Sequence, residues 1–419
     1  MNTCEEYESE VRTYCRHFPA VFSSAEGSSM YTVKQEEYLD FFCGAGALNY
    51  GHNHPEIKKA VITYLQGNGI MHSLDMYTQA KMEFVDTFQN RILRKRNLDY
   101  KMMFCGPTGT NANEAALKIA RKAKKRSNVF AFMGAFHGMT LGSLALTSDS
   151  FSRKGAGTGL SDVTFMPFPF GYNTSFDTIA YIDNVLTDDH SGIAKPAAIF
   201  CETVQAEGGV VIADTEWLKR LRALCDKHDI LLICDEIQVG CGRTGSFFSF
   251  ERAGIVPDMV SLSKSISGLG LPMSLLLIKP EIDCLAPGEH NGTFRGSQLS
   301  FVGAKRAAEL FDEVDIPSLV KQKEKIICNY ITQEILPMDE RLEHRGIGCI
   351  HGIDFSNYHL PGLARMVADE CFKKGLIIEL AGRGDSVLKL MPALVISNQE
   401  LLKGLEIIKK SMQVILKKI

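Results

Sequence analysis

The sequence lacks the features that mark membrane, secreted and disulfide-rich proteins. No apolar run approaches the length of a membrane span, and the first residues, Met1-Asn-Thr-Cys-Glu-Glu-Tyr-Glu, are acidic where a secretory signal requires basic residues and then an apolar stretch. The 12 cysteines stand singly, without a Cys-x-x-Cys pair, which argues against a disulfide framework and is typical of a reducing compartment. We therefore expect a cytoplasmic protein that does not associate with membranes.

An excess of positive charge is also missing. The 46 Lys and Arg residues are balanced by 49 Asp and Glu residues, and the densest basic run, Lys118 to Arg126, is explained by the solvated side of a helix. We therefore expect no nucleic-acid partner. His52 and His54 are two imidazoles before a proline and fall short of a ligand set, so we assign no metal site.

The length and composition indicate a folded protein with more than one core. With 419 residues, of which 45% are hydrophobic and 23% charged, the chain can form two packed domains with a site between them. The apolar spacing predicts strands at 129–133, 197–201, 230–234 and 259–262, and helices at 110–126 and 217–225. Such alternation indicates an α/β fold with a mostly parallel sheet.

The C-terminal part has a different character. After about residue 307 the pattern favours longer amphipathic helices, which indicates a smaller α+β domain. The last helix is the best marked, because Ser397 and Glu400 form a capping box and Ile396 and Leu401 are placed as its hydrophobic staple.

An acid and an amine are predicted to meet at one edge of the sheet. The apolar strand that begins at Leu231 ends in Asp235 and Glu236, and the next strand delivers Lys264 to the same edge, where open α/β sheets bind their ligands. The pair would suit pyridoxal 5′-phosphate (PLP), because the amine can bond to the aldehyde and a carboxylate beside the pyridine nitrogen keeps it protonated. A surface lysine and an acidic strand end would explain these residues equally well.

Two further motifs lie where such a cofactor would need them. The turn Cys105-Gly-Pro-Thr-Gly109-Thr110 opens the helix at 110–126, and the exposed amides of a helix start suit a phosphate. Phe136-His137-Gly138 follows the next strand, which places an aromatic ring where it could stack on a flat heterocycle. Many glycine turns bind nothing and Phe136 could be a core residue, so neither motif decides by itself.

Along the chain the motifs follow the order phosphate turn, aromatic residue, aspartate and lysine. This order resembles that of the class III aminotransferases, PLP enzymes of fold type I. The resemblance extends from about Tyr31 to the C-terminus and is carried by Gly51-His-Asn-His-Pro55, the glycine turn, Phe136-His137-Gly138, Asp235-Glu-Ile-Gln238, Lys264 and Gly292-Thr293. It implies an N-terminal segment, 1–50, that packs on the small domain and the active site, a large PLP-binding domain, 51–307, and a small C-terminal domain, 308–419.

The resemblance also implies a role for each motif residue. Lys264 would carry the cofactor as the catalytic amine, with Asp235 on the ring nitrogen. Gly109 and Thr110 would hold the phosphate, Phe136 would stack on the ring, His137 would complete the cofactor pocket, and Gln238 would contact the ring hydroxyl. Thr293 would reach the phosphate bound by a neighbouring subunit, which implies a homodimer or a dimer of dimers with shared active sites.

One part of the family pattern is altered. The segment Glu202-Thr-Val-Gln-Ala-Glu207 resembles a glutamate segment whose last carboxylate pairs with a C-terminal arginine in ornithine- and aminobutyrate-type relatives. Here Lys389 stands in place of that arginine. Lysine is a point charge rather than a bidentate fork, so the substrate carboxylate would be held more loosely or shared with Arg383 or Arg295.

The substrate side of the pocket is also altered. Residues 42–50 are small and glycine-rich where ornithine-type relatives carry an aromatic residue, so Ala45 would border the substrate. Together with 271–273 and 287–296, this stretch resembles the diaminobutyrate:2-oxoglutarate aminotransferases of ectoine- and siderophore-type pathways. Small amino and oxo acids would be the partners. The alternatives are another ω-aminotransferase, acting on ornithine, acetylornithine, aminobutyrate or lysine, and a PLP aminomutase.

Overall fold

A seven-stranded sheet forms the centre of the computed structural model, which describes residues 3–419. Its spatial order is β4 (Lys101–Phe104), β12 (Leu275–Ile278), β11 (Met259–Leu262), β10 (Leu231–Asp235), β7 (Ala198–Cys201), β5 (Val129–Phe132) and β6 (Val163–Met166). All strands run in one direction except β12, which is antiparallel to both neighbours. The predicted α/β fold with a mostly parallel sheet is therefore confirmed.

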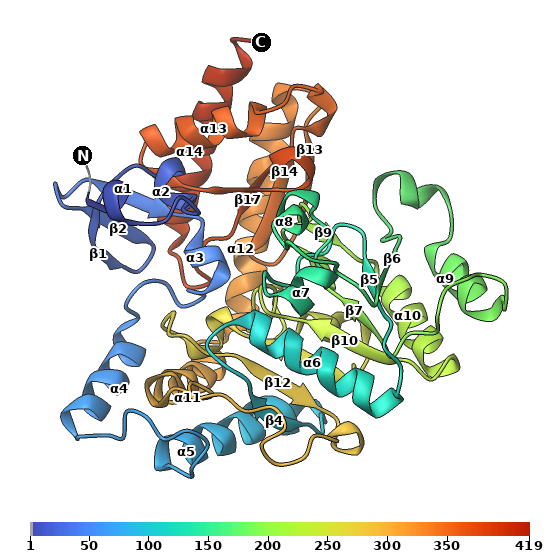
Figure 1. The fold of residues 1–419 in the computed structure, drawn as a ribbon. Coiled ribbons are helices and arrows are strands. Elements are labelled where there is room, and N and C mark those ends of the chain that lie inside the picture. Colours follow the sequence, from blue (N-terminus) through green and yellow to red (C-terminus); the bar gives the residue numbers. More distant parts are fainter. Residues whose placement is uncertain (1–2) are drawn as a thin grey trace.

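Helices cover both faces of this sheet (Figure 1). Leu231 and Ile233 of β10 share a core with α6 (Gly109–Lys124), whereas Leu232 and Cys234 share a second core with α10 (Thr215–Lys227). Successive side chains of a strand point to opposite faces, so an unbroken apolar run is what a strand covered on both sides requires. Trp217 of α10 lies in the core, and its Nε1 donates a hydrogen bond to Thr178 Oγ1 of α9 (Thr178–Thr187) at 2.8 Å.

A group of helices packs beside this sheet and continues toward the C-terminal part. Helix α11 (Gln298–Glu313) contacts α4 (Pro55–Gln66) and α5 (Gln79–Phe88). The large core continues through α11 as far as Val320 on α12 (Ile316–Tyr330). The boundary predicted at residue 307 thus falls inside α11, because the face of this helix that packs on the large core extends beyond that position.

The C-terminal part has its own sheet and core. Strands β13 (Glu343–Ile347), β14 (Ile350–Asp354), β17 (Val387–Leu390) and β16 (Glu379–Ala381) pair in that order, beside α13 (Leu363–Lys373) and α14 (Asn398–Leu416). The predicted capping box of α14 is present, since Ser397 Oγ accepts from Glu400 N at 3.1 Å and a Glu400 oxygen accepts from Ser397 N at 3.0 Å.

The N-terminal strands join the C-terminal part (Figure 1). Strands β1 (Phe22–Glu26), β2 (Ser29–Thr32) and β3 (Glu37–Asp40) form a sheet that β15 (Leu376–Ile377) completes by pairing with β3. The remaining elements are α1 (Thr3–Tyr7), α2 (Tyr14–His17), α3 (Cys43–Gly46), α7 (Leu141–Leu146), α8 (Ser150–Lys154), β8 (Val204–Gln205) and β9 (Val211–Ile212). None of the helices within residues 3–419 has the length and apolar character that crossing a bilayer requires.

Candidate active site

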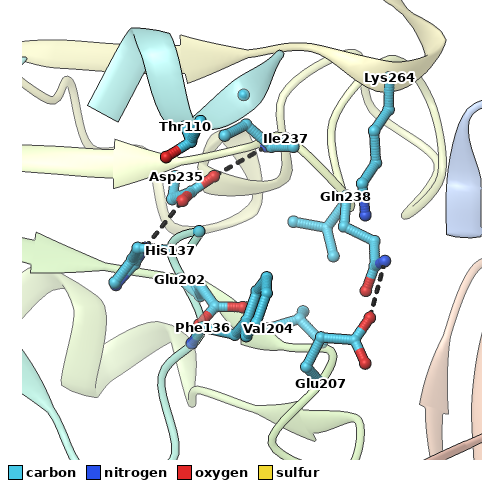
Figure 2. A pocket seen from close by; sticks show the side chains of 13 residues that line it. Thr110, Phe136, His137, Glu202, Val204, Glu207, Asp235, Ile237, Gln238 and Lys264 are labelled. Atoms are coloured by element: carbon cyan, nitrogen blue, oxygen red, sulfur yellow. Dashed lines mark hydrogen bonds and ion pairs between the residues drawn. The ribbon is translucent and has the colours of Figure 1, made fainter. Parts of the chain in front are cut away.

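A cavity of about 180 Å³ lies at the carboxyl end of β10, the edge at which the sequence places the acid and the amine. Its predicted lining residues are Gly109, Thr110, Phe136, His137, Glu207, Asp235, Gln238 and Lys264, and Gly138, Glu202, Val204, Ile237 and Val239 complete the wall. Residues from five separate parts of the chain thus converge on one space (Figure 2).

Asp235 is the last residue of β10 and is held rigidly. One carboxylate oxygen, Oδ2, accepts hydrogen bonds from Asn113 Nδ2 and His137 Nδ1, both at 2.8 Å. The other oxygen, Oδ1, accepts from Ile237 N at 3.1 Å. Burial lowers the pKa of His137, but the hydrogen bond and charge of Asp235 outweigh it and raise that pKa overall. The acid is therefore fixed in orientation by a backbone amide and two side chains, as a group that must hold a proton on a ligand should be.

Lys264 enters the cavity from the turn that follows β11 (Figure 2). Its φ of 51° is in the left-handed region, which costs a non-glycine residue roughly 1 kcal/mol or more and is kept where function fixes a side chain. Burial lowers the pKa of the Lys264 amine, and the charge of Lys389 lowers it further. The nearby carboxylates act in the opposite direction, but the pKa is lowered overall. A lowered pKa favours the neutral amine that bonds to carbonyl carbon.

The first turn of α6 forms one end of the cavity. Thr108 N and Oγ1 donate to Asn111 Oδ1 at 3.2 and 3.0 Å, which fixes the turn, while the amides of Gly109 and Thr110 belong to the first turn, where a helix leaves N–H groups without carbonyl partners. Gly138 packs against this turn. A Cβ at Gly138 would lie 2.6 Å from Thr110 Oγ1.

Phe136 is not a core residue. Its side chain is 37% exposed and lines the cavity, so the stacking role fits its position better than burial does. Phe136 N donates to Glu202 Oε1 at 2.9 Å. Sequence reasoning assigned no role to Glu202 or Asn113. Asn113 lies on the buried face of the alanine-rich helix, and a polar residue among alanines was the available signal.

Gln238 and Glu207 form the opposite wall. Gln238 Nε2 donates to Ala45 O at 2.8 Å and to Glu207 Oε1 at 3.0 Å, which leaves the buried Gln238 Oε1 without a hydrogen-bond partner within residues 3–419. Ala45, with φ of 56°, therefore positions Gln238 through its carbonyl. It is not among the residues that line the cavity.

Lys389 lies behind Glu207 and is fully buried. Its Nζ donates to Glu207 Oε1 at 2.6 Å, so the structure forms the carboxylate–lysine pair that the sequence suggested. Glu379 Oε2 lies 3.0 Å from the same Nζ, and Tyr14 OH donates to Glu379 Oε1 at 3.1 Å. Glu379 and Tyr14 were missed by the sequence reasoning, because only the pairing of β16 with β17 places Glu379 opposite Lys389.

Three other predicted residues lie outside the cavity wall. Thr293 is exposed, and its carbonyl accepts from His72 Nε2 at 2.9 Å. Arg383 is exposed, makes no hydrogen bond or ion pair among the described residues, and lies with its guanidinium 5.6 Å from the centre of the Phe170 ring. Arg295 donates to His290 O at 3.2 Å.

The fold supplies an acidic partner that the sequence did not reveal for His52. Asp40 Oδ2 lies 2.8 Å from His52 Nε2, within hydrogen-bond distance, and one such contact is not a ligand set. His344 and His351 of the C-terminal sheet and Cys328 of α12 bring three potential ligand atoms within 4.8 Å of one another. His344 Nε2 and His351 Nδ1 are hydrogen-bonded at 3.0 Å, and His351 Nε2 donates to Gly348 O at 2.9 Å, so both nitrogens of His351 are occupied.

Comparison with known proteins agrees with this geometry. The sequence pattern described as Aminotransferase class-III matches residues 12–412. The chain belongs to the class III aminotransferases. The resemblance inferred from the motifs is thereby confirmed.

Relatives of this class III aminotransferase are similar over their whole length. A protein from Halalkalibacterium halodurans, named diaminobutyrate–2-oxoglutarate transaminase, is 48% identical over 99% of this chain and 96% of its own. Proteins of the same name from Wolinella succinogenes and Streptomyces coelicolor are each 49% identical, over 100% and 99% of this chain and 97% and 98% of their own.

Solved structures share the fold. An ornithine aminotransferase from Toxoplasma gondii, with partial occupancy of PLP at its active site, has a TM-score of 0.87 at 23% identity and covers 99% of this chain and 94% of its own. A transaminase from the marine bacterium Virgibacillus has a TM-score of 0.89 at 17% identity, over 99% of this chain and 98% of its own. At these identities the likeness concerns the fold alone.

Proposed function

We propose that this class III aminotransferase is a PLP-dependent diaminobutyrate:2-oxoglutarate transaminase. In the proposed reaction, glutamate and aspartate semialdehyde give 2,4-diaminobutyrate and 2-oxoglutarate. The observation that carries the proposal is the convergence of Lys264 and Asp235 on one cavity that opens at the start of α6. The substrate assignment draws on the names of relatives that are 48–49% identical over the full chain.

The residues present fit PLP. Gly109 and Thr110 offer first-turn amides to a phosphate, and Asp235 offers a carboxylate to a protonated pyridine nitrogen. The free Gln238 Oε1 can accept a hydrogen bond from a ring hydroxyl, and Phe136 and Val204 supply apolar surface for the ring. When bound, PLP would supply the electron sink that transamination needs.

The side chains of the chain itself would handle protons and orientation. Asp235 would keep a proton on the ring nitrogen, and the hydrogen bonds from Asn113 and His137 would keep the carboxylate aimed at it. Lys264, once freed by an incoming amine, would act as the base that moves a proton from the substrate carbon at its Nζ. Burial of Lys264 supports this, because it favours the neutral, proton-accepting amine.

We further propose that Glu207 and Lys389 adjust the pocket to the two substrates. Lys389 is buried behind Glu207, so it can contact a substrate carboxylate only if the Glu207 carboxylate moves aside. Arg383, exposed and without an ion-pair partner among the described residues, is the second candidate for that carboxylate. Ala45 would act on the substrate side through Gln238, to which it is hydrogen-bonded.

We propose a homodimer, or a dimer of dimers, in which Thr293 reaches the phosphate site of the neighbouring subunit. Support comes from an exposed apolar strip beside Thr293, formed by the 70–77 segment and Phe294, which is stacked edge-to-face on His72 at 5.5 Å. Its large side chains are 49–90% exposed: Ile70, Met71, Leu74, Met76, Tyr77 and Phe294. A group of exposed large apolar side chains is a sign of a protein interface.

The proposal extends to the setting in which the enzyme works. We infer a cytoplasmic enzyme of small amino and oxo acids, with no nucleic-acid or membrane partner, from the near-neutral charge and from cysteines that stand singly in the sequence without a Cys-x-x-Cys motif. We also propose that the N-terminal segment 1–50, the large domain 51–307 and the small domain 308–419 act as the units that enclose the substrate.

The first experiment tests the lysine. Wild-type protein incubated with PLP should develop the cofactor's visible absorbance and convert glutamate and aspartate semialdehyde to 2-oxoglutarate and diaminobutyrate, whereas Lys264→Ala should lose turnover by at least about 10³-fold. Retained turnover in Lys264→Ala would refute the role of the lysine. Lys279→Ala, which removes a surface lysine paired with Asp258, is the matched control and should keep full activity.

The same assay separates the rival activities. Ornithine, acetylornithine, aminobutyrate and lysine, offered as amino donors with 2-oxoglutarate, test the other ω-aminotransferases. An aminomutase would keep nitrogen on one carbon skeleton, so release of 2-oxoglutarate from glutamate excludes it. If another donor had a higher kcat/KM than diaminobutyrate, the substrate assignment would be overturned.

A further inference from the structure

Two carboxyl groups surround one amine behind the cavity. Glu207, Lys389 and Glu379 form one buried cluster in which a single ammonium lies 2.6 Å from one carboxylate oxygen and 3.0 Å from the other. The charge of Glu207 raises the pKa of Lys389 against the effect of burial, so the lysine is charged. Burial raises the pKa of Glu379 although Lys389 lies beside it, and the charge of Glu207 adds to the rise, so a further cation at this acid would favour its charged form.

One oxygen of Glu379 is open to such a partner. Glu379 Oε1 accepts the hydroxyl hydrogen of Tyr14 at 3.1 Å. Glu379 Oε2 is buried and makes no hydrogen bond among the described residues, because its 3.0 Å contact with Lys389 Nζ lacks hydrogen-bond geometry. A buried carboxylate oxygen without a donor loses the hydrogen bonds that it makes in water, so a donor that enters with the substrate would be bound strongly.

The cluster is fixed on the Lys264 side of the cavity. Glu379 and Lys389 are directly opposite each other in the antiparallel pair β16–β17, so their side chains share one face of the sheet. The charges of Glu207, Lys389 and Glu379 all act on the pKa of Lys264, and Glu207 itself lines the cavity. The cluster therefore reaches the cavity through Glu207, and its charges act on the amine of Lys264, whereas Glu379 and Lys389 lie behind the cavity wall.

The two proposed substrates differ in what they carry at that end. Glutamate reacts through its single ammonium and leaves a carboxylate at the far end, whereas 2,4-diaminobutyrate reacts through its 4-amino group and leaves an ammonium beside its carboxylate. We propose that Glu379 is a specificity-determining residue, which accepts a hydrogen bond from this second ammonium at Oε2 once the Glu207 carboxylate has moved aside. The inference rests on the proposed function, because only an ω-amino acid with an α-ammonium would use this contact.

The position of Glu379 is not fully explained by the need to neutralise the charge of Lys389. Glu207 already gives Lys389 a shorter contact, at 2.6 Å, with hydrogen-bond geometry. A second acid that served only the lysine would be expected to accept a hydrogen bond from Nζ, yet Glu379 Oε2 does not, and Tyr14 holds the other oxygen away. Glu379 Oε2 is paired with the charge of Lys389 but keeps its capacity to accept a hydrogen bond.

Two donors that differ by one group test the proposal. 2,4-Diaminobutyrate and 4-aminobutyrate have the same chain and the same reacting amine, but only the first has the second ammonium. In Glu379→Gln we expect the KM for diaminobutyrate to rise about 10- to 100-fold, the range for a charged hydrogen bond. The same variant should change the KM for the amino donor 4-aminobutyrate, or the inhibition constant if this donor is not turned over, by less than about threefold.

Two further variants separate the contact from general effects. Tyr14→Phe keeps the Glu379 carboxylate and removes one hydrogen bond from it, so it should raise the KM for diaminobutyrate by a smaller factor with the same selectivity. Asp385→Asn removes a negative charge six residues along the same segment, at an exposed position outside the cluster, and should leave both constants unchanged. Thermal melting of each variant reports whether folding is intact.

The outcomes are distinguishable. If wild-type protein does not use diaminobutyrate with 2-oxoglutarate, the proposed function fails, whatever the variants do. If wild-type protein uses it but Glu379→Gln raises the constants of diaminobutyrate and 4-aminobutyrate by equal factors, the proposed function stands and the role of Glu379 is refuted. Calorimetric binding of L-2-aminobutyrate and butyrate to the Lys264→Ala protein gives a readout without turnover, and Glu379→Gln should weaken only the first.

Discussion

At the scale of single residues, Glu202 is a carboxyl group buried in the cavity wall. Its Oε1 accepts from Phe136 N at 2.9 Å, and no ion pair involves it among the described residues. Burial raises the pKa of Glu202 from its ordinary value of 4.5 to about 7, with Asp235 and Glu207 adding to the rise and His137 opposing it. The folded protein therefore favours the protonated acid.

The stability of the fold should depend on pH through this residue. An acid whose pKa is raised by folding contributes its stabilisation fully below 4.5 and loses it as the pH rises through about 7. Between pH 4.5 and pH 8, wild-type protein should lose up to about 3 kcal/mol of unfolding free energy relative to Glu202→Gln, by denaturant titration at each pH. Glu216→Gln on the exposed side of α10 is the control, and a parallel pH profile for wild type and Glu202→Gln would contradict this account.

Asp235 and Glu236 are adjacent carboxylates, and the sequence alone could not decide which of them lines the cavity. The sequence placed Asp235 and Glu236 together at the sheet edge, but only Asp235 lines the cavity. Glu236 accepts hydrogen bonds from Ser249 N at 2.7 Å and Phe250 N at 3.1 Å, so it holds a distant loop against the strand. Strand alternation sends neighbours to opposite faces, but which face carries the site depends on the helices that cover them.

At the scale of elements, the turn at Gly138 links the aromatic strand end to the phosphate end of the cavity. Gly138 has φ of 126°, which other residues rarely adopt, and a Cβ there would collide with Thr110 Oγ1. Thr110 is held in turn by a 2.6 Å hydrogen bond with Thr140 Oγ1. The turn therefore fixes the first residues of α6.

Gly138→Ala should weaken PLP binding by about tenfold or more, because the new methyl group displaces Thr110 from the phosphate end. The measurement is the dissociation constant of PLP from its absorbance on titration. Gly157→Ala is the matched control, since Gly157 also has positive φ, 66°, but nothing lies within 4 Å of a Cβ there. Equal PLP affinity in the two variants would show that the contact with Thr110 has no part in binding.

The sequence predicted the elements with strong local patterns. Strands β5, β7, β10 and β11 and helices α6, α10 and α14 lie within a few residues of their predicted positions, since long apolar runs and caps are local signals. Strand β12 was not predicted, and it is antiparallel between β11 and β4. The contact of Glu379 with Lys389 could not be predicted from the sequence either, because it depends on the register of two short strands.

At the scale of the whole molecule, Arg243 joins three parts of the chain in one buried position. It is fully buried, and its guanidinium donates to Asn49 Oδ1 at 2.6 Å, to Cys349 O at 3.0 Å and to Pro392 O. These acceptors belong to the N-terminal segment and to the C-terminal part, whereas Arg243 follows β10 in the large core. The three parts are thereby held in a fixed relation, which is what brings Tyr14 and Lys389 to a cavity lined by residues of the large sheet.

The proposed dimer leads to a prediction about mixed subunits. Lys264→Ala inactivates a subunit's own site, whereas Thr293→Asp would place a negative charge against the phosphate of the partner's site. Neither variant should be active by itself. Mixed by unfolding and refolding in equal amounts, they should regain about a quarter of wild-type activity, because half of the dimers are then hybrids and each hybrid has one site free of both changes.

Complementation of this kind requires that each site be built from two chains. If Thr293 served only its own subunit, each hybrid would hold one site damaged at Lys264 and one damaged at position 293, and activity would stay at the level of the separate variants. The 70–77 segment provides the matched control, since Tyr77→Asp at this 90% exposed position should weaken association without touching either site. When the mixed variants also carry Tyr77→Asp, dilution should abolish the regained activity over the same concentration range in which sedimentation shows the dimer to dissociate. A site that is built from two chains is lost when the chains separate.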